Sequence, residues 1–138
     1  MLFRSPFTPW TTLEQVRALV EFVAAQDLVG NVDPVQYTIR LLVPPGSYLL
    51  NRPEMKEHLG PLNVASFSYT WEHPDPRMDR LQKEVSALVE KDTEKGEDPG
   101  VTFYRVTALA SGRSPSQALP LLPVDRLRAP RLSEPWFC

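Results

Sequence analysis

The stretch Asp33-Pro34-Val35-Gln36-Tyr37-Thr38-Ile39-Arg40-Leu41 carries the strongest strand pattern in the chain. Apolar or aromatic side chains occupy its odd positions from 35 to 41, and polar side chains occupy the even positions. Alternation of this kind, in residues that are largely β-branched or aromatic, predicts a strand over 35–41 with one apolar and one polar face. The turn residues Asp33-Pro34 precede the strand, and Pro44-Pro45-Gly46-Ser47 ends it.

A helix is predicted before this strand, and the end of another strand before the helix. Thr11-Thr12-Leu13-Glu14 has the form of a capping box, in which Thr11 is the cap and Glu14 reaches back to it. An apolar stripe at helical spacing follows and continues to residue 23. Residues 2–10 are typical of a strand end that runs into a loop bounded by prolines. Strand, helix and strand in this order predict a right-handed crossover between two parallel strands.

The positions of the prolines predict three further helices. Pro53 would begin a short helix that ends near residue 59, while Asp75-Pro76 and Asp98-Pro99 each place a capping carboxylate before a proline at the first helical position. On the helix that begins at Pro76, the spacing of Asp79 and Lys83 favours an ion pair. The stretch 62–69 is ambiguous. From residue 111 onward, prolines preclude a long regular element and predict an extended tail that lies on a surface.

The composition narrows the class of protein. The chain has 138 residues, of which 42% are hydrophobic and 23% charged, as expected for one domain of ordinary size. A net charge of −2 provides no basic field for nucleic acid, and no apolar run is long enough to cross a bilayer. The single cysteine, Cys138, excludes a disulfide framework and a cysteine-rich metal site. We therefore expect a cytoplasmic protein without a nucleic-acid or membrane partner.

Two parallel strands are too few to make a stable sheet, because both faces and both edges would be open. The sequence therefore predicts the last part of a larger α/β protein, begun at an internal methionine. The expected fold is the C-terminal portion of a partial (β/α) barrel, with two parallel strands, about four helices and an extended Pro-rich tail. The expected boundaries are 1–52 for the end of the barrel, 53–112 for a helical extension and 113–138 for the tail.

Several blocks of sequence carry a resemblance to a known family. The blocks Phe7-Thr8-Pro9-Trp10-Thr11-Thr12-Leu13, Asp33-Pro34-Val35-Gln36-Tyr37 and Ile39-Arg40-Leu41-Leu42-Val43-Pro44-Pro45-Gly46-Ser47 resemble the C-terminal half of a radical S-adenosylmethionine (SAM) barrel. The tail Arg131-Leu132-Ser133-Glu134-Pro135-Trp136-Phe137-Cys138 is similar to the end of the CUAEP/CCAEP-tail branch. That branch continues with a second cysteine or a selenocysteine, followed by Ala-Glu-Pro.

The resemblance implies a [4Fe–4S] cluster and reductive cleavage of SAM to a radical, with the substrate unknown. The family's Cys-x3-Cys-x2-Cys cluster motif is missing from this chain, whose one cysteine cannot hold a cluster. The resemblance therefore implies a piece of an enzyme that is inactive alone and whose partner is the N-terminal half of the barrel. Cys138 becomes a candidate for one half of a thiol or selenol pair. In this hypothesis the next codon encodes selenocysteine and has been read as a stop codon.

The candidate cofactor-binding residues are Arg40, Gln36 and Thr38, which share the polar face of the predicted strand. In a barrel this face would point into the lumen, and Arg40 would lie near the C-terminal end of a parallel strand, where barrel active sites are built. Its guanidinium suits the carboxylate of SAM or a substrate anion. The alternative is an edge strand whose polar face is solvated. Thr8 and Trp10 would lie at the same mouth of the barrel.

A second function stays open beside the first. The chain could be a small non-catalytic α/β binding module that docks a partner through its Pro-rich tail. No metal site is predicted, because Trp71-Glu72-His73-Pro74-Asp75 is better explained as a turn around two prolines than as a set of ligands.

Overall fold

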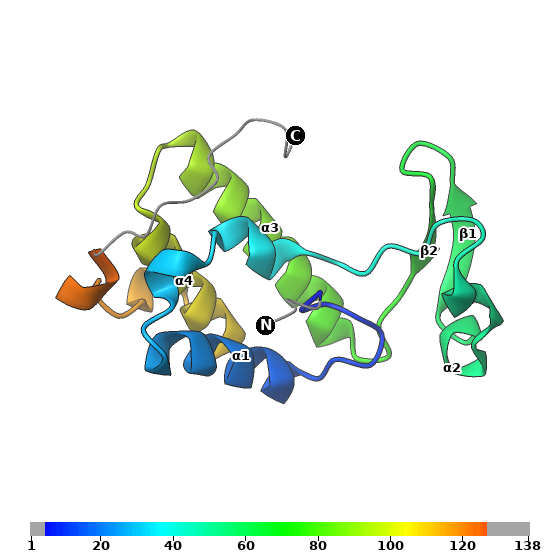
Figure 1. The fold of residues 1–138 in the computed structure, drawn as a ribbon, viewed down its shortest axis with the longest axis horizontal. Helices are drawn as coiled ribbons and strands as arrows, with labels where there is room; N and C mark the ends of the chain where they lie inside the picture. The colour runs from blue at the N-terminus through cyan, green and yellow to red at the C-terminus, as the bar shows by residue number, and fades with distance from the viewer. Residues whose placement is uncertain (1–4, 127–138) are drawn as a thin grey trace.

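The computed structural model describes residues 5–126, which form a mixed fold of helices and strands (Figure 1). The α-helices in this range are α1 (Leu13–Ala25), α2 (Pro53–Lys56), α3 (Pro76–Glu94) and α4 (Pro99–Ala110), and the strands are β1 (Leu59–Asn63) and β2 (Ser68–Trp71). Short 3₁₀ turns connect them: η1 (Val29–Asn31), η2 (Pro34–Thr38), η3 (Tyr48–Asn51), η4 (Pro115–Gln117) and η5 (Pro123–Arg126). The predicted mixture of helix and strand is confirmed.

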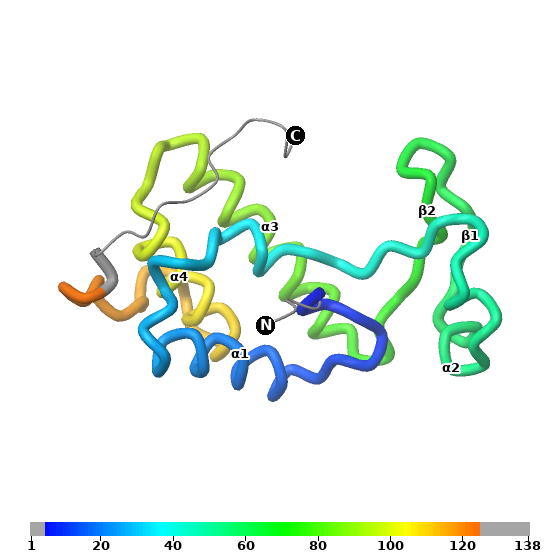
Figure 2. The backbone as a smooth tube through the Cα atoms, in the orientation of Figure 1, coloured from blue at the N-terminus to red at the C-terminus, as the bar shows by residue number. Residues whose placement is uncertain are grey.

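The chain divides its packing between two regions. We call residues 5–40 and 72–126 the helical body, which contains α1, α3 and α4, and residues 41–71 the hairpin lobe, which contains α2, β1 and β2. Figure 2 shows one extended stretch leaving the helical body for the hairpin lobe and a second one returning to α3. Among residues 5–126, no helix combines the length and the apolar character that crossing a bilayer requires.

The helices of the body begin where the sequence places caps. The Asp75 carboxylate accepts the N–H of Arg77, and the Asp98 carboxylate accepts the N–H of Gly100, so both predicted Asp-Pro starts are confirmed. At α1 the capping box lies one residue later than predicted. Thr12 and Gln15 form it, because the Thr11 hydroxyl is hydrogen-bonded to that of Thr8, at 2.7 Å.

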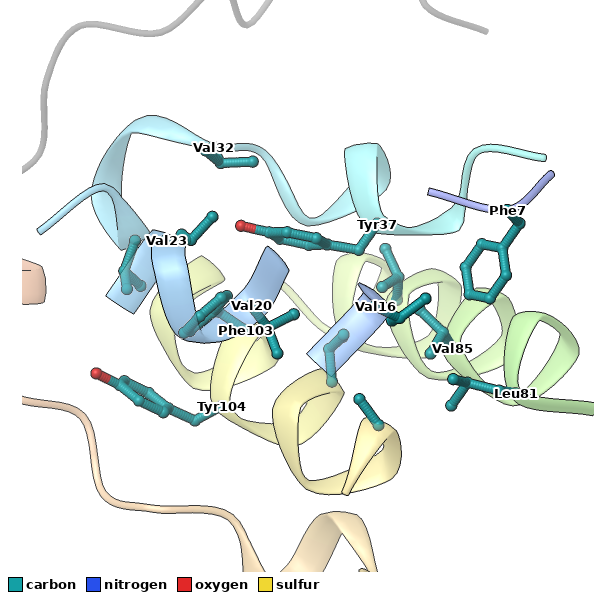
Figure 3. Close-up of a cluster of buried hydrophobic side chains, with 14 of the residues drawn as sticks. Phe7, Val16, Val20, Val23, Val32, Tyr37, Leu81, Val85, Phe103 and Tyr104 are labelled. Atoms are coloured by element: carbon teal, nitrogen blue, oxygen red, sulfur yellow. The ribbon is translucent and has the colours of Figure 1, made fainter. Parts of the chain in front are cut away.

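The core of the helical body is a continuous cluster of aliphatic and aromatic side chains (Figure 3). The predicted stripe of α1 supplies Val16, Val20 and Val23 to this cluster, and α3 supplies the predicted stripe that includes Val85. Phe103 of α4 is 1% exposed and stands at its centre. Burial of such residues is the main favourable contribution to folding.

The predicted strand over 35–41 is wrong. Residues Pro34–Thr38 form the 3₁₀ turn η2, capped by the Asp33 carboxylate, which accepts the N–H of Val35 at 3.0 Å. The turn buries Tyr37 against Phe103, with ring centroids 5.6 Å apart, and leaves Val35 46% exposed. Strand preference reflects packing on a sheet, and here one aromatic side chain packs on helices instead.

A parallel contact does form, but it is an isolated bridge. Phe7 pairs with Arg40 in parallel orientation: the N–H of Phe7 donates to the Ile39 carbonyl at 3.3 Å, and the N–H of Leu41 donates to the Phe7 carbonyl at 2.8 Å. The pairing does not extend into a ladder. In the part of the chain that the structure describes, the sheet is instead the antiparallel pair β1–β2, and it covers the stretch that the sequence left ambiguous.

The hairpin lobe has a small core of its own. Val43 and Met55 are both 0% exposed and Trp71 is 5% exposed, with several leucines packed around them. The register of β1 and β2 shifts between Leu59 and Leu62. Gly60 lies in this irregular part, where an added Cβ would collide with the Thr70 hydroxyl unless that side chain shifted.

The tail follows α4 over the helical body. Through residue 126 it is extended, interrupted by the turns η4 and η5, and its residues Ala118 and Leu121 pack against the core of the body. This agrees with the prediction of an extended segment that lies on a surface. Cys138 and the rest of the block similar to the CUAEP/CCAEP tail lie outside the described residues.

Candidate functional site

The main candidate site is the junction between the two regions, where a cleft of about 860 Å³ opens. The helical body contributes Arg40, Asp79 and Lys83 to its walls, and the hairpin lobe contributes His58 and Thr70. Clefts between separately packed units are common binding sites, because two walls can supply different groups.

Arg40 occupies the centre of the junction. Its Nη1 donates to Asp79 Oδ1 at 2.5 Å, and its Nη2 donates to the carbonyl oxygen of Trp71 at 2.5 Å. The guanidinium carbon also lies 3.6 Å from the centroid of the Trp71 ring, which is a cation–π contact. One side chain thus joins the stretch that leaves the body, the end of β2 and the first turns of α3.

The other groups of the junction reinforce this arrangement. The indole N–H of Trp71 donates to the carbonyl of Leu41 at 2.8 Å, which ties the outgoing stretch to β2. The second oxygen of Asp79 accepts the backbone N–H of His73 at 2.9 Å. The helical spacing had predicted that Asp79 pairs with Lys83, but Asp79 pairs with Arg40 instead. The guanidinium of Arg40 offers a shorter and better directed bond.

His73 is held by backbone groups on both ring nitrogens. Its Nε2 lies 2.8 Å from the carbonyl oxygen of Thr11, and its Nδ1 accepts the N–H of Asp75 at 2.8 Å. Because a carbonyl oxygen only accepts, Nε2 is the donor in the bond to Thr11. Both nitrogens are thereby engaged in joining the start of α1 to the start of α3, which is a structural role.

Of the three predicted cofactor-binding residues, the structure brings only Arg40 to the cleft. Thr38 lies on η2, where its hydroxyl donates to the Val35 carbonyl at 2.7 Å and its own carbonyl accepts the amide of Gln82 at 3.0 Å. Gln36 is half-buried on the same turn. The three do not share one face, because the strand that would have aligned them is replaced by a turn. Their role in cofactor binding stays a prediction, and Cys138 lies outside the described residues.

The residues present do not fit the cofactors that the resemblance implies. A [4Fe–4S] cluster requires several thiolates, and residues 5–126 contain no cysteine. Within the same range no three acidic, histidine or cysteine side chains gather in a way that could hold a metal ion. For SAM, Arg40 is a single anchor that is already paired with Asp79, and Gln36 and Thr38 do not converge on it.

The groups with clearly shifted pKa values lie outside the cleft. The hydrogen bonds from the Arg77 side chain and backbone lower the pKa of Asp75 from 3.8 to about 2. The pKa of Arg105 is raised by its hydrogen bond to Asp92, which links α3 to α4. Shifted groups often mark functional sites, but these two belong to a helix cap and an interhelical pair.

Trp71 and Asp79 are the junction residues that sequence reasoning missed. Trp71 lies in a segment that the prolines had predicted to be a turn. For Asp79, the helical spacing had predicted an ion pair with Lys83. Their partner Arg40 is more than thirty positions away, so no local pattern could have joined them. The one available signal was the strand-like stretch of residues 68–71, which ends on an aromatic residue.

A second hollow of about 540 Å³ lies beside the Phe7–Arg40 bridge. Thr8, Trp10 and Leu41 are among the residues that line it, and Trp10 is 46% exposed. Thr8 and Trp10 are the residues expected at a barrel mouth.

No family model, no curated protein and no solved structure matches the chain. Any functional conclusion therefore depends on the residues and their geometry.

Proposed function

We propose that the chain is the C-terminal part of a radical SAM enzyme of the CUAEP/CCAEP-tail branch and contributes the closing portion of a partial (β/α) barrel. The observation that carries the proposal is the parallel bridge between Phe7 and Arg40. These residues belong to two of the blocks that resemble the family, and they lie 33 positions apart in the chain. Their contact has the parallel orientation that a βαβ crossover through α1 requires.

The open edge beside this bridge supports the proposal. Because Phe7 bonds to the groups of residues 39 and 41, the N–H and C=O of Arg40 point away from it. Within residues 5–126 these two backbone groups have no hydrogen-bond partner. Next to them, Ile39 is 40% exposed and Leu42 is 70% exposed. A parallel strand from another part of a barrel would bond to the two backbone groups of Arg40 and would cover the side chains of Ile39 and Leu42.

In this proposal the cluster and its chemistry belong to the N-terminal half of the barrel. That half would carry the Cys-x3-Cys-x2-Cys motif and bind the [4Fe–4S] cluster and SAM. The chain described above would supply the last parallel segments, the helices that cover them and the segment that leads to the terminal Cys138. Alone it would produce no radical from SAM.

The test pairs the chain with the polypeptide that carries a Cys-x3-Cys-x2-Cys motif, encoded upstream in frame or in a neighbouring gene. Tagged chain co-expressed with that polypeptide should retain it together with iron and sulfide, and the complex should form 5′-deoxyadenosine from SAM with dithionite. Ile39→Asp should weaken the association, whereas Phe22→Asp, 42% exposed on α1, should not. Isolation of the chain from its own cells as a stable folded species without such a polypeptide would overturn the proposal.

A second candidate function is supported by the tail. The segment after α4 lies against the helical body in an ordered path and presents apolar side chains outward: Leu119 is 58% exposed and Leu122 is 50% exposed. This favours the alternative of a non-catalytic binding module that docks a partner through its Pro-rich tail. The two candidates involve different surfaces, so both can hold.

A further inference from the structure

The segment Ala118–Val124, which we call the proline arm, begins in the polyproline II conformation, and its prolines favour a polyproline II helix through Leu122. Ala118 has φ −63° and ψ 148°, which are polyproline II values. Leu119 and Leu122 each precede a proline, and this position restricts a residue to the extended or polyproline II region. Residues 118–122 belong to no helix or strand. Such a helix has three residues per turn, so every third residue faces the same way.

The exposure of the side chains follows this period of three. Ala118 and Leu121 are partly buried and pack against the core of the helical body. Leu119 and Leu122 are 58% and 50% exposed, and both prolines of the arm, Pro120 and Pro123, are exposed as well. One face of the arm is thus fixed to the body, while two leucine–proline pairs face outward.

Gly100 forms the seat of the proline arm, by which we mean the place on the helical body where the side chain of Leu121 packs. It is buried in the first turn of α4, and a Cβ added to it would lie 2.4 Å from Cδ1 of Leu121. An alanine here would push the end of the Leu121 side chain out of its present position. Because the arm is held in its extended form before any partner arrives, docking costs less conformational entropy than it would for a free tail.

The chemistry of the arm selects one mode of recognition. Proline has no N–H, so Pro120 and Pro123 disfavour pairing with the edge of a sheet and preclude entry into a groove as a helix. The exposed groups of residues 118–123 are apolar or uncharged, which offers no basis for binding an anionic polymer. Sequences of the form Φ-Pro-x-Φ-Pro, where Φ is apolar, are read by grooves lined with aromatic side chains, in which each Φ-Pro pair fills one hollow.

We propose that the proline arm docks into an aromatic-lined groove of a partner protein, which reads Leu119-Pro120 and Leu122-Pro123 as consecutive Φ-Pro pairs. Leu121 is the intervening residue, and it faces the helical body rather than the partner. The inference rests on the second candidate function, docking through the tail, and is independent of the radical SAM assignment.

The first experiment uses known groove domains as probes. The ¹⁵N-labelled full chain is titrated with a panel of purified SH3 and WW domains and followed by NMR. We expect shifts centred on residues 119–123 with at least one domain. Leu119→Ala and Leu122→Ala should each weaken that binding about tenfold. Leu42→Ala, a more exposed leucine of the hairpin lobe, should leave it unchanged.

The seat is tested by variants that release the arm. Leu121→Ala and Gly100→Ala should both weaken binding, although neither residue would touch the partner. Gly100→Ala also disturbs the first turn of α4. If that variant unfolds, Leu121→Ala decides the test. Binding to no domain of the panel, or binding unaffected at Leu119 and Leu122, would overturn the inference.

A second experiment separates this inference from the docking function. A photo-reactive residue at position 119 is introduced into the full chain in its own cells, and cross-linked partners are identified. Cross-links to a groove lined with aromatic residues support the inference. Reproducible cross-links to a site without one would overturn it while leaving docking through the tail in place. Absence of any cross-link would overturn both.

Discussion

At the scale of single residues, Arg40 is the side chain that joins the elements of the junction, through two hydrogen bonds and a cation–π contact. It contacts Asp79 on α3 and Trp71 at the end of β2, while its own backbone pairs with Phe7. Its side chain is 27% exposed and that of Asp79 is 24% exposed, so solvent screens the ion pair only in part. The planar guanidinium makes both bonds and the ring contact at once, which an ammonium group could not do.

Replacing this side chain should therefore destabilise the protein measurably. We expect Arg40→Ala to lower the free energy of unfolding by about 2 kcal/mol, because a charge-assisted bond, a bond to a carbonyl and a cation–π contact are lost together. Arg80→Ala is the matched control, since the Arg80 side chain is exposed on α3 and makes no hydrogen bond or ion pair within residues 5–126. Urea denaturation measures both variants. Equal effects at the two positions would contradict the role assigned to Arg40.

Asp75 gives stability a dependence on pH. Hydrogen bonds from Arg77 lower the pKa of Asp75 in the folded protein from 3.8 to about 2. A lowered folded pKa means that the ionised carboxylate stabilises the fold above about pH 4 and that this contribution disappears as the pH falls to about 2. Asp75→Asn should thus be less stable than the natural chain at pH 5, and the difference should shrink toward pH 2.

Urea titrations between pH 5 and pH 2.5 measure this difference. Glu84→Gln removes an exposed carboxylate of the same helix that has no partner within residues 5–126, and it controls for net charge. A gap between Asp75→Asn and the natural chain that stays constant over this range would contradict the assignment.

At the scale of elements, the helices were predictable and the strand was not. The Asp-Pro starts of α3 and α4 and the stripes of α1 and α3 follow from local spacing, because capping groups and apolar side chains lie within one or two turns of each other. The alternation of residues 35–41 is also local, but a strand needs neighbours to pair with. Among residues 5–126 the segment finds one pairing neighbour, Phe7, so Tyr37 packs on the helices and the segment becomes a turn.

The predicted cofactor-binding group failed to assemble for the same reason. A shared face for Gln36, Thr38 and Arg40 depended on strand geometry over the whole stretch. Arg40 alone lies beyond η2, in the extended part, and it alone reaches the cleft. Its partners Trp71 and Asp79 come from other elements, and such long-range pairs depend on packing that the local pattern does not encode.

The link between α3 and α4 is the clearest polar contact between elements. Asp92 is 3% exposed and accepts the Thr102 hydroxyl at 3.1 Å and Nη1 of Arg105 at 2.8 Å. Asp92→Asn removes the charge that Arg105 pairs with inside the interface, and we expect a loss of about 2 to 3 kcal/mol in the free energy of unfolding. Glu90→Gln, exposed on the same helix, should change it by less than about 0.5 kcal/mol. Thermal or urea unfolding checks the pair, and a loss no larger than that of the control would contradict the link.

At the scale of the whole molecule, the two regions have separate hydrophobic cores. The core of the helical body includes Met78 and Phe103, and the core of the hairpin lobe consists of Val43, Met55 and Trp71 with their neighbours. Of the buried residues that the structure describes, none belongs to both cores. Besides the two extended stretches (Figure 2), the regions are joined by the contacts of Arg40 with Trp71 and by two backbone bonds, from Leu41 N–H to the Phe7 carbonyl and from Glu72 N–H to the His58 carbonyl. Because these links are few, we expect the hairpin lobe to open without unfolding of the body.

Two buried methionines offer a matched test of this separation. Met55 is 0% exposed in the hairpin lobe and Met78 is 1% exposed in the helical body, so truncation of either to alanine should leave a similar cavity and cost about 2 to 4 kcal/mol locally. Met55→Ala should therefore speed amide hydrogen exchange in β1 and β2 while α1, α3 and α4 keep their protection. Met78→Ala should speed exchange in the helices, and in the hairpin as well if the lobe depends on the body for its own stability. Equal loss of protection throughout the chain in Met55→Ala would show instead that the two cores unfold as one unit and that the bonds of Arg40 couple them fully.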